Sequence, residues 1–200
     1  MQLLLTTPMP VMALLMALPL ATARVAAAPP FSWETVPVFA ETSNVSGVFD
    51  AEALAVLARF PVFVGEKAYA YREPGFAEDK LSHLAATLRE LNKDIFLIFY
   101  FNANLDMDDY RLNNVTEVHA PDWWLRNSSN VPFLAPVDSG KGSRPPFPYS
   151  KGLHVFDFTV PDMREAWVNE CMTMTSTGGF DSCTYSGEYN AINGPKTGAS

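Results

Sequence analysis

The sequence is poor in the features that mark several special classes of protein. Only two cysteines, Cys171 and Cys183, occur in 200 residues, so disulfides do not define this fold. The two could pair in an oxidising compartment or remain as two buried thiols. Basic residues number 14 against 22 acidic ones, and the net charge of −8 leaves no basic stripe to release phosphate counterions. This excludes nucleic acid as an expected partner.

Recognisable catalytic and cofactor motifs are also lacking. There is no Gly-x-Ser-x-Gly elbow, no phosphate-binding loop and no dinucleotide fingerprint. His83, His119 and His154 are scattered and lack the spacing of a zinc site. Residues 106–117 match a calcium loop at three acidic positions, but Arg111 stands where that loop requires glycine. The sequence therefore predicts neither a metal nor a cofactor.

Long apolar runs are confined to the beginning of the chain. Residues 11–20 are rich in Met, Ala and Leu, and a small-x-small pattern ends at Ala23. A membrane span needs about 20 apolar residues, and this run is shorter and interrupted by Pro19. Residues 1–23 are therefore predicted to be a signal peptide cleaved after Ala23, with a buried N-terminal helix as the alternative. The protein is then secreted, and no stable membrane span is expected.

Three Asn-x-Ser/Thr sequons agree with a secretory route. Asn44, Asn114 and Asn127 are the acceptor residues, and each falls in a predicted loop where a glycan would not disturb packing. A Pro/Ala-rich lead, residues 24–32, follows the signal peptide. The folded part is then expected over residues 33–188, followed by a polar tail at 189–200.

The middle of the chain alternates strand-like and helix-like segments. Short apolar runs at 35–42, 61–67, 95–102 and 180–186 predict strands. Helices are predicted from an N-cap at Asp50 to about residue 60, over about 77–92, and from Thr159 to Gly178. The second helix should bury one face, formed by Leu81, Leu84, Ala85, Leu88 and Leu91.

One long segment does not fit this alternation. Residues 103–153 are irregular and rich in Asn, Asp, Pro, Gly and Ser, apart from two adjacent tryptophans. A loop of this length is uncommon unless it carries function or a small structure of its own. A short strand is then expected at 155–158.

This order of elements predicts an α/β fold of parallel βα repeats. Right-handed crossovers set the strands parallel, which suits either an open sheet or part of a (β/α)8 TIM barrel. A complete barrel typically takes about 250 residues, so about four strands correspond to half of one. In such sheets the functional residues gather beyond the carboxyl ends of the strands. Glu66, Lys67 and Asn102, which end two of the apolar runs, are the first candidates.

Several short motifs follow one another in a fixed order along the chain. They are residues 35–39, 58–61, 66–67, 99–102, 122–126, 156–157 with Pro161 and Arg164, and 179–181. This ordered set resembles TIM-barrel glycoside hydrolases, a family of secreted proteins. The resemblance extends over about residues 33–186 and covers the N-terminal half of such a barrel. It implies a (β/α)8-like architecture and carbohydrate as the substrate.

Glycoside hydrolysis generally needs two carboxyl groups, which are expected here from Glu66 and Glu188. In barrels of this kind the strand after Gly179-Phe-Asp usually ends in an acidic residue. Ser186 stands at that place, so either Glu188 takes it after a local shift or the acidic group is absent. Glu41, after the first strand, is the other candidate. A polar cluster of Glu66 with Lys67 is the structural alternative to catalysis.

Substrate contacts are expected from Lys67, Asn102, Trp123, Trp124 and Asp157. An Asn after a strand could bind a sugar hydroxyl or form a turn, and Asp157 could line the cleft or cap the next helix. Tryptophan offers an aromatic face for a sugar ring. Because adjacent side chains seldom face the same way, one of the two tryptophans is expected in the core.

Three hypotheses about function remain open from the sequence. The first is a secreted, glycoside-hydrolase-like protein that acts by acid/base catalysis, represented by a partial chain. The second is a carbohydrate-binding or interaction protein without catalysis. The third is an inactive gene fragment, whose open sheet edges would favour self-association.

Overall fold

The structure is a computed structural model, and it describes residues 27–30, 32, 34, 38–119, 121–135 and 152–185. The segment predicted as a signal peptide and the polar tail lie outside the described residues, as does Glu188. None of the helices in these ranges is both long enough and apolar enough to cross a bilayer.

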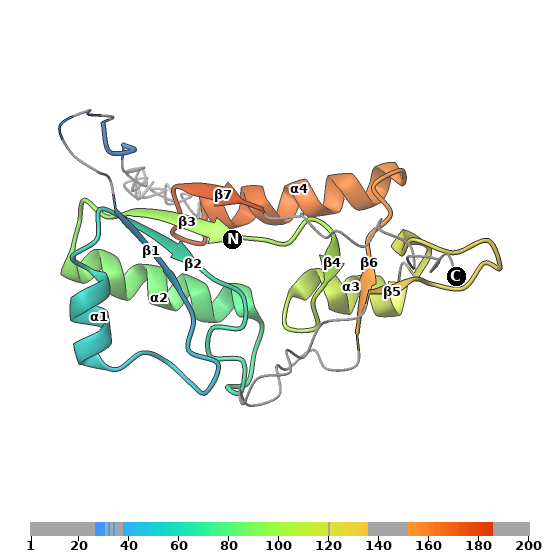
Figure 1. The fold of residues 1–200 in the computed structure, drawn as a ribbon, viewed down its shortest axis with the longest axis horizontal. Helices are drawn as coiled ribbons and strands as arrows, with labels where there is room; N and C mark the ends of the chain where they lie inside the picture. Colours follow the sequence, from blue (N-terminus) through green and yellow to red (C-terminus); the bar gives the residue numbers. More distant parts are fainter. Residues whose placement is uncertain are drawn as a thin grey trace, which may run out of the picture.

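Four strands form one parallel sheet whose strand order follows the chain (Figure 1). They are β1 (Phe39–Thr42), β2 (Val62–Gly65), β3 (Phe96–Tyr100) and β7 (Ser182–Thr184), and each neighbouring pair is parallel. The predicted parallel βα repeats are therefore confirmed. Because the strand order never reverses, right-handed crossovers place the connecting helices on one side of the sheet. This is the arrangement of a partial TIM barrel, not of a doubly wound sheet.

The first two helices are close to their predicted positions. Helix α1 (Ala51–Leu57) is capped by Asp50, whose Oδ1 accepts the Ala53 N–H at 2.8 Å, as the sequence predicts. It ends before the predicted residue 60, because Pro61 disfavours a helical conformation in the residue that precedes it. Helix α2 (Ala77–Leu91) follows the second strand and matches its predicted bounds within one residue.

The core lies between the sheet and α2. Phe63, Leu97 and Phe99 point to one side of the strands and are at most 1% exposed. They belong to one buried cluster with the apolar face of α2. That face contains Leu81, Leu84, Ala85 and Leu88, as predicted, but not Leu91, which is 55% exposed. Leu91 is the last residue of α2, and the next residue, Asn92, already has an extended backbone.

The segment predicted as irregular contains a second, antiparallel sheet. Its strands are β4 (Leu105–Asp106), β5 (Leu134–Ala135) and β6 (Leu153–Val155), in the order β4-β6-β5. Helix α3 (Arg111–His119) and a 3-10 turn, η1 (Pro121–Trp123), come between β4 and β5. Figure 1 shows that these elements gather beyond the carboxyl end of β3. Of the two alternatives, small structure is therefore present in the described part of this segment.

The approach to the last helix differs from the prediction in two details. Strand β6 ends at Val155, and residue 156 continues only as an isolated bridge to Trp124, so the strand predicted at 155–158 is wrong in its bounds. Helix α4 (Pro161–Ser176) begins after Val160, with no side-chain cap. Thr159 lies one residue before the N-cap position, and its hydroxyl donates to Asp157 Oδ1 at 2.6 Å.

A disulfide joins the last helix to the edge of the sheet. Cys171 in α4 and Cys183 in β7 have their sulfur atoms 2.00 Å apart and their Cα atoms 5.7 Å apart. Of the two sequence alternatives, the structure therefore has the disulfide and not the free thiols. The bond fixes α4 against β7, the strand that pairs with β3.

Candidate functional site

Three of the candidate residues lie close together where β2 and β3 end. Glu66 and Lys67 follow directly after β2, and the Lys67 Nζ is 2.5 Å from Glu66 Oε1. The same ammonium lies 4.4 Å from the centre of the Tyr100 ring, within the range of a cation–π contact. The Asn102 Nδ2 donates to the Tyr100 hydroxyl at 2.9 Å. Tyr100 thus joins the end of β2 to the end of β3, a role that the sequence did not assign to it.

Burial controls the electrostatics of Glu66. It raises the pKa of the Glu66 carboxyl, and the negative charges of Glu41 and Asp109 act in the same direction. The hydrogen bond and positive charge of Lys67 oppose this, but the pKa stays above its usual value. Burial would lower the pKa of Lys67, but the hydrogen bonds and charges of Glu66 and Tyr100 together outweigh it, so the pKa of Lys67 is also raised. A carboxyl with a raised pKa at the end of a strand is suited to hold a proton.

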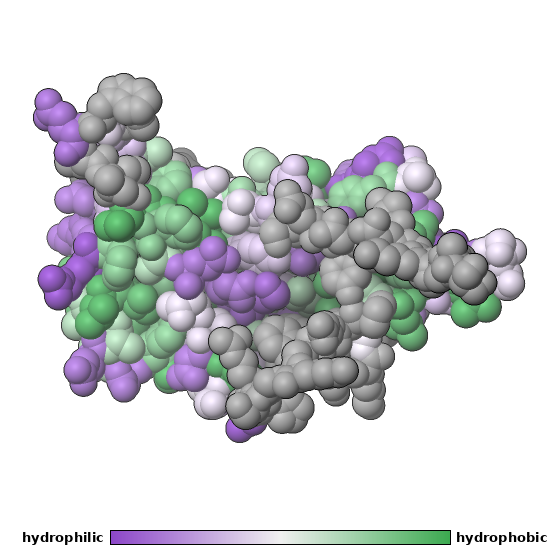
Figure 2. Space-filling model, in the orientation of Figure 1, coloured by the Kyte–Doolittle hydropathy of each residue, from purple (hydrophilic) through white to green (hydrophobic). Residues whose placement is uncertain are grey.

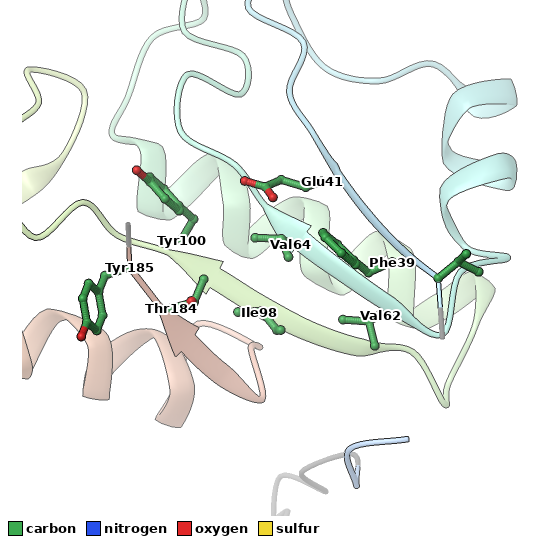
Figure 3. Close-up of a pocket in the computed structure, with 9 residues that line it drawn as sticks. Phe39, Glu41, Val62, Val64, Ile98, Tyr100, Thr184 and Tyr185 are labelled. Atoms are coloured by element: carbon green, nitrogen blue, oxygen red, sulfur yellow. The ribbon is translucent and has the colours of Figure 1, made fainter. Parts of the chain in front are cut away.

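The face of the sheet opposite α2 forms a concave surface next to these residues. Figure 3 shows Phe39 and Glu41 of β1, Val64 of β2, and Ile98 and Tyr100 of β3 projecting into it. Its volume is about 490 Å³, which lies within the range of small-molecule sites. Strand pairing sets Glu41 beside Val64 and Val64 beside Ile98. Glu41 supplies a carboxylate to this surface, one residue before the carboxyl end of β1.

Aromatic and aliphatic side chains make this surface mainly apolar. Phe39 is 59% exposed and Tyr185, after β7, is 66% exposed. Figure 2 shows hydrophobic surface over the region of β1 and β2, bordered by hydrophilic side chains toward the middle of the molecule. A ligand here would contact ring faces and aliphatic groups, with polar contacts at one end.

The side chain of Asn102 stabilises the turn that follows β3. Its Oδ1 accepts the backbone N–H groups of Asn104 at 2.8 Å and Leu105 at 2.7 Å, which forms the turn into β4. Asn102 is 8% exposed, and its backbone carbonyl accepts the Trp167 indole N–H at 3.0 Å. Asn102 therefore contributes to the site by fixing the Tyr100 hydroxyl.

The two tryptophans and Asp157 make their contacts around the second sheet. Trp124 is 9% exposed, stacks on His154 with ring centres 3.7 Å apart, and donates to Asp106 at 2.6 Å. Trp123 is half-buried against the main core. Asp157 accepts the Thr159 backbone N–H at 2.9 Å, so it stabilises the turn before α4. The structure does not bring these three residues to the Glu66 and Lys67 pair.

The three sequons occupy different settings. Asn44 is half-buried in a turn, where its Nδ2 donates to the Val48 carbonyl at 3.1 Å. Asn127 is exposed in the turn before β5. Asn114 is exposed but lies within α3, so its predicted place in a loop is wrong. Glycosylation at all three stays a prediction.

Comparisons with known proteins find a limited similarity in structure and none in sequence. No protein-family model matches the chain, and no curated protein matches it by sequence. Among solved structures, a noncanonic maltogenic alpha-amylase, AmyB from Thermotoga neapolitana, matches with a TM-score of 0.45 at 12% identity. The glucosidase II alpha subunit matches with a TM-score of 0.44 at 12% identity. Each match covers 74% of this chain, but only 38% and 15% of those two proteins, respectively.

Proposed function

We propose that this chain binds a carbohydrate at the carboxyl ends of β1 to β3 and hydrolyses a glycosidic bond with Glu66 as the acid. The observation that carries the proposal is the Glu66 carboxyl, which is half-buried at the end of a parallel strand with a raised pKa. It lies at the end of the sheet near a concave surface that includes Glu41. The substrate class follows from the ordered sequence resemblance to TIM-barrel glycoside hydrolases.

The roles of the two carboxyl groups follow from their surroundings. Protonated Glu66 would donate its proton to the glycosidic oxygen as the bond to the anomeric carbon breaks. Exposed Glu41, whose charge helps to raise the pKa of Glu66, would act as the second carboxylate, either on water or on the anomeric carbon. Glu188, the second carboxyl group expected from the sequence, lies outside the described residues.

Substrate binding would use the surface beside this pair. The exposed rings of Phe39 and Tyr185 offer apolar faces to a sugar ring. Lys67 would donate to a sugar hydroxyl while remaining near the Tyr100 ring. Secretion, which would bring the protein to extracellular polysaccharides, stays a prediction from the sequence.

Carbohydrate binding without turnover is the second candidate function. The observation that favours it is the 2.5 Å contact between Lys67 Nζ and Glu66 Oε1. A carboxylate held in this ion pair serves as a fixed acceptor for sugar hydroxyls, and it would not give up a proton.

A panel of oligosaccharides and polysaccharides separates the two functions. Purified protein is incubated with each sugar at pH 5 to 7, and new reducing ends are measured beside equilibrium binding by calorimetry. Hydrolysis of at least one sugar is the expected result. Binding without new reducing ends would replace the first function by the second, and the absence of both would contradict a carbohydrate function.

A further inference from the structure

The loop after β2, residues 66–73, has an unusual backbone. Ala68 has φ of 63° and Ala70 has φ of 50°, both in the left-handed region that residues with a Cβ rarely adopt. Both alanines are buried, with at most 1% exposed. A loop with two such residues persists only where its surroundings hold it. Because the loop begins with Glu66 and Lys67, the contacts that hold it also set the position of these two side chains.

Contacts from two directions hold the far part of this loop. The Ala70 N–H donates to the Asn44 carbonyl at 2.7 Å, and the Arg72 N–H donates to the Val45 carbonyl at 3.3 Å, both in the loop after β1. On the other side, Lys80 of α2 donates its Nζ to the Ala70 carbonyl at 3.1 Å. These bonds act four or more residues after Glu66.

A hydrogen bond nearer to Glu66 holds the loop from the turn between β4 and α3. The Ala68 N–H donates to Asp109 Oδ2 at 3.3 Å. Asp109 is 7% exposed, and its own carbonyl accepts the Ala77 N–H at 2.7 Å at the beginning of α2. The backbone of Asp109 is therefore anchored independently of the loop that its carboxylate contacts, and the contact is made two residues after Glu66.

We propose that Asp109 is a positioning residue for Glu66, because its buried carboxylate holds the Ala68 amide and supplies a negative charge that acts on the Glu66 carboxyl. The proposal rests on the proposed role of Glu66. Among the residues that the structure describes, three charged groups act on that carboxyl: Lys67 on the same loop, Glu41 on β1 and Asp109. Burial is the main cause of the raised pKa of Glu66, and Asp109 and Glu41 add to it, whereas Lys67 opposes it.

Two variants separate the charge of Asp109 from its hydrogen bond. Asp109→Asn keeps an acceptor for the Ala68 N–H but removes the charge, so it should lower the pKa of Glu66 and leave Ala68 protected. Asp109→Ala removes both, so it should also speed hydrogen exchange at the Ala68 amide by about tenfold, the effect of losing one hydrogen bond. The neighbouring Asp108→Ala is the matched control, because exposed Asp108 accepts from the Tyr71 hydroxyl, in the far part of the same loop, and not from the Ala68 N–H.

The Glu66 carboxyl is titrated by carbon-13 NMR and the Ala68 amide is followed by hydrogen exchange, both in the full chain. A lower pKa of Glu66 in both Asp109 variants, with faster exchange at Ala68 only in Asp109→Ala, is the expected result. A Glu66 titration equal to that of the wild type in Asp109→Asn would overturn the proposal, and this variant decides even if Asp109→Ala does not fold. Neither readout needs turnover, so failure of the proposed hydrolysis is seen separately, in the sugar panel.

Discussion

Glu66→Gln should lower turnover of the hydrolysed sugar by about 10²- to 10⁴-fold, the range that a positioned general acid contributes. Glutamine has nearly the shape of glutamate but has no proton to give to the glycosidic oxygen. The side-chain oxygen of glutamine can still accept the Lys67 N–H. The hydrogen bond that is 2.5 Å long in the wild type can therefore be kept without the negative charge of Glu66. Steady-state kinetics on the sugar identified in the panel, with affinity measured by calorimetry, gives the comparison.

The matched control is Glu73→Gln, which makes the same change at an exposed position later in the same loop. It should keep wild-type turnover. In the wild type, turnover should fall as pH rises through the raised pKa of Glu66, because the acid form is lost there. Wild-type turnover in Glu66→Gln would remove Glu66 as the acid, even if the sugar binds at the predicted place.

Glu78→Gln should stabilise the folded protein at pH 8 by about 1 to 3 kcal/mol, because the variant removes a buried carboxylate whose pKa is raised. Glu78 lies in the first turn of α2 and is 1% exposed. Its Oε1 accepts the Arg111 backbone N–H at 3.0 Å, but its Oε2 has no hydrogen-bond partner in the described structure. Oε1 of Glu170, in α4, has none either, and its nearest cation is the Arg111 guanidinium at 3.9 Å. Unless one of the two carboxyl groups is protonated, Glu78 Oε2 and Glu170 Oε1 are thus buried acceptors without a hydrogen-bond donor among the described residues.

The pH dependence of this cluster has a definite sign. Burial, aided by the negative charge of Glu170, raises the pKa of Glu78 from 4.5 to about 7. Below pH 4.5 the carboxyl is protonated in both the folded and unfolded states, so its stabilising contribution is fully present. As pH rises from 4.5 to 7 the unfolded state loses its proton first, and about 3 kcal/mol of stability is lost by pH 8. The pKa values of Glu66 and Glu170 are raised as well, so they act in the same direction.

Glutamine at position 78 supplies the missing donor. Its oxygen can accept the Arg111 N–H while its amide N–H donates to the Glu170 carboxylate, and the glutamine side chain itself does not titrate. Urea unfolding of wild type and variant across this range should show a pH slope that is shallower in Glu78→Gln. Glu90→Gln, an exposed change in the same helix, should stay within about 0.5 kcal/mol of wild type. Equal slopes in wild type and Glu78→Gln would contradict the assignment of this carboxyl.

Local signals in the sequence were sufficient for the parallel sheet and its helices. The apolar run that contains β3 is long, uninterrupted and rich in Phe and Ile, which is typical of a strand buried on both faces. Asp50 predicts the start of α1, because an N-cap aspartate accepts a hydrogen bond from the first turn of its own helix. Glu66 and Lys67 were found because they follow such a strand directly, so their position needs no tertiary information.

Features that depend on distant contacts were missed. Strands β4 and β5 have two residues each, too few for any periodicity to appear. Asp109 meets Ala68 across 41 residues of sequence, and nothing local in either segment indicates that pairing. Glu78 looks like a solvated residue in the helical pattern, since glutamate is almost never buried. Its burial depends on α3 and α4, which pack beside it only in the folded chain.

The place of sugar binding is the central claim, and amide chemical-shift mapping tests it most directly. The hydrolysed or bound sugar is titrated into isotope-labelled full-length protein, and shifts are followed residue by residue. The largest shifts should fall at Glu41, Glu66, Lys67 and Tyr100, around the carboxyl ends of β1 to β3. Shifts confined to the second sheet, around Trp124, would contradict the account.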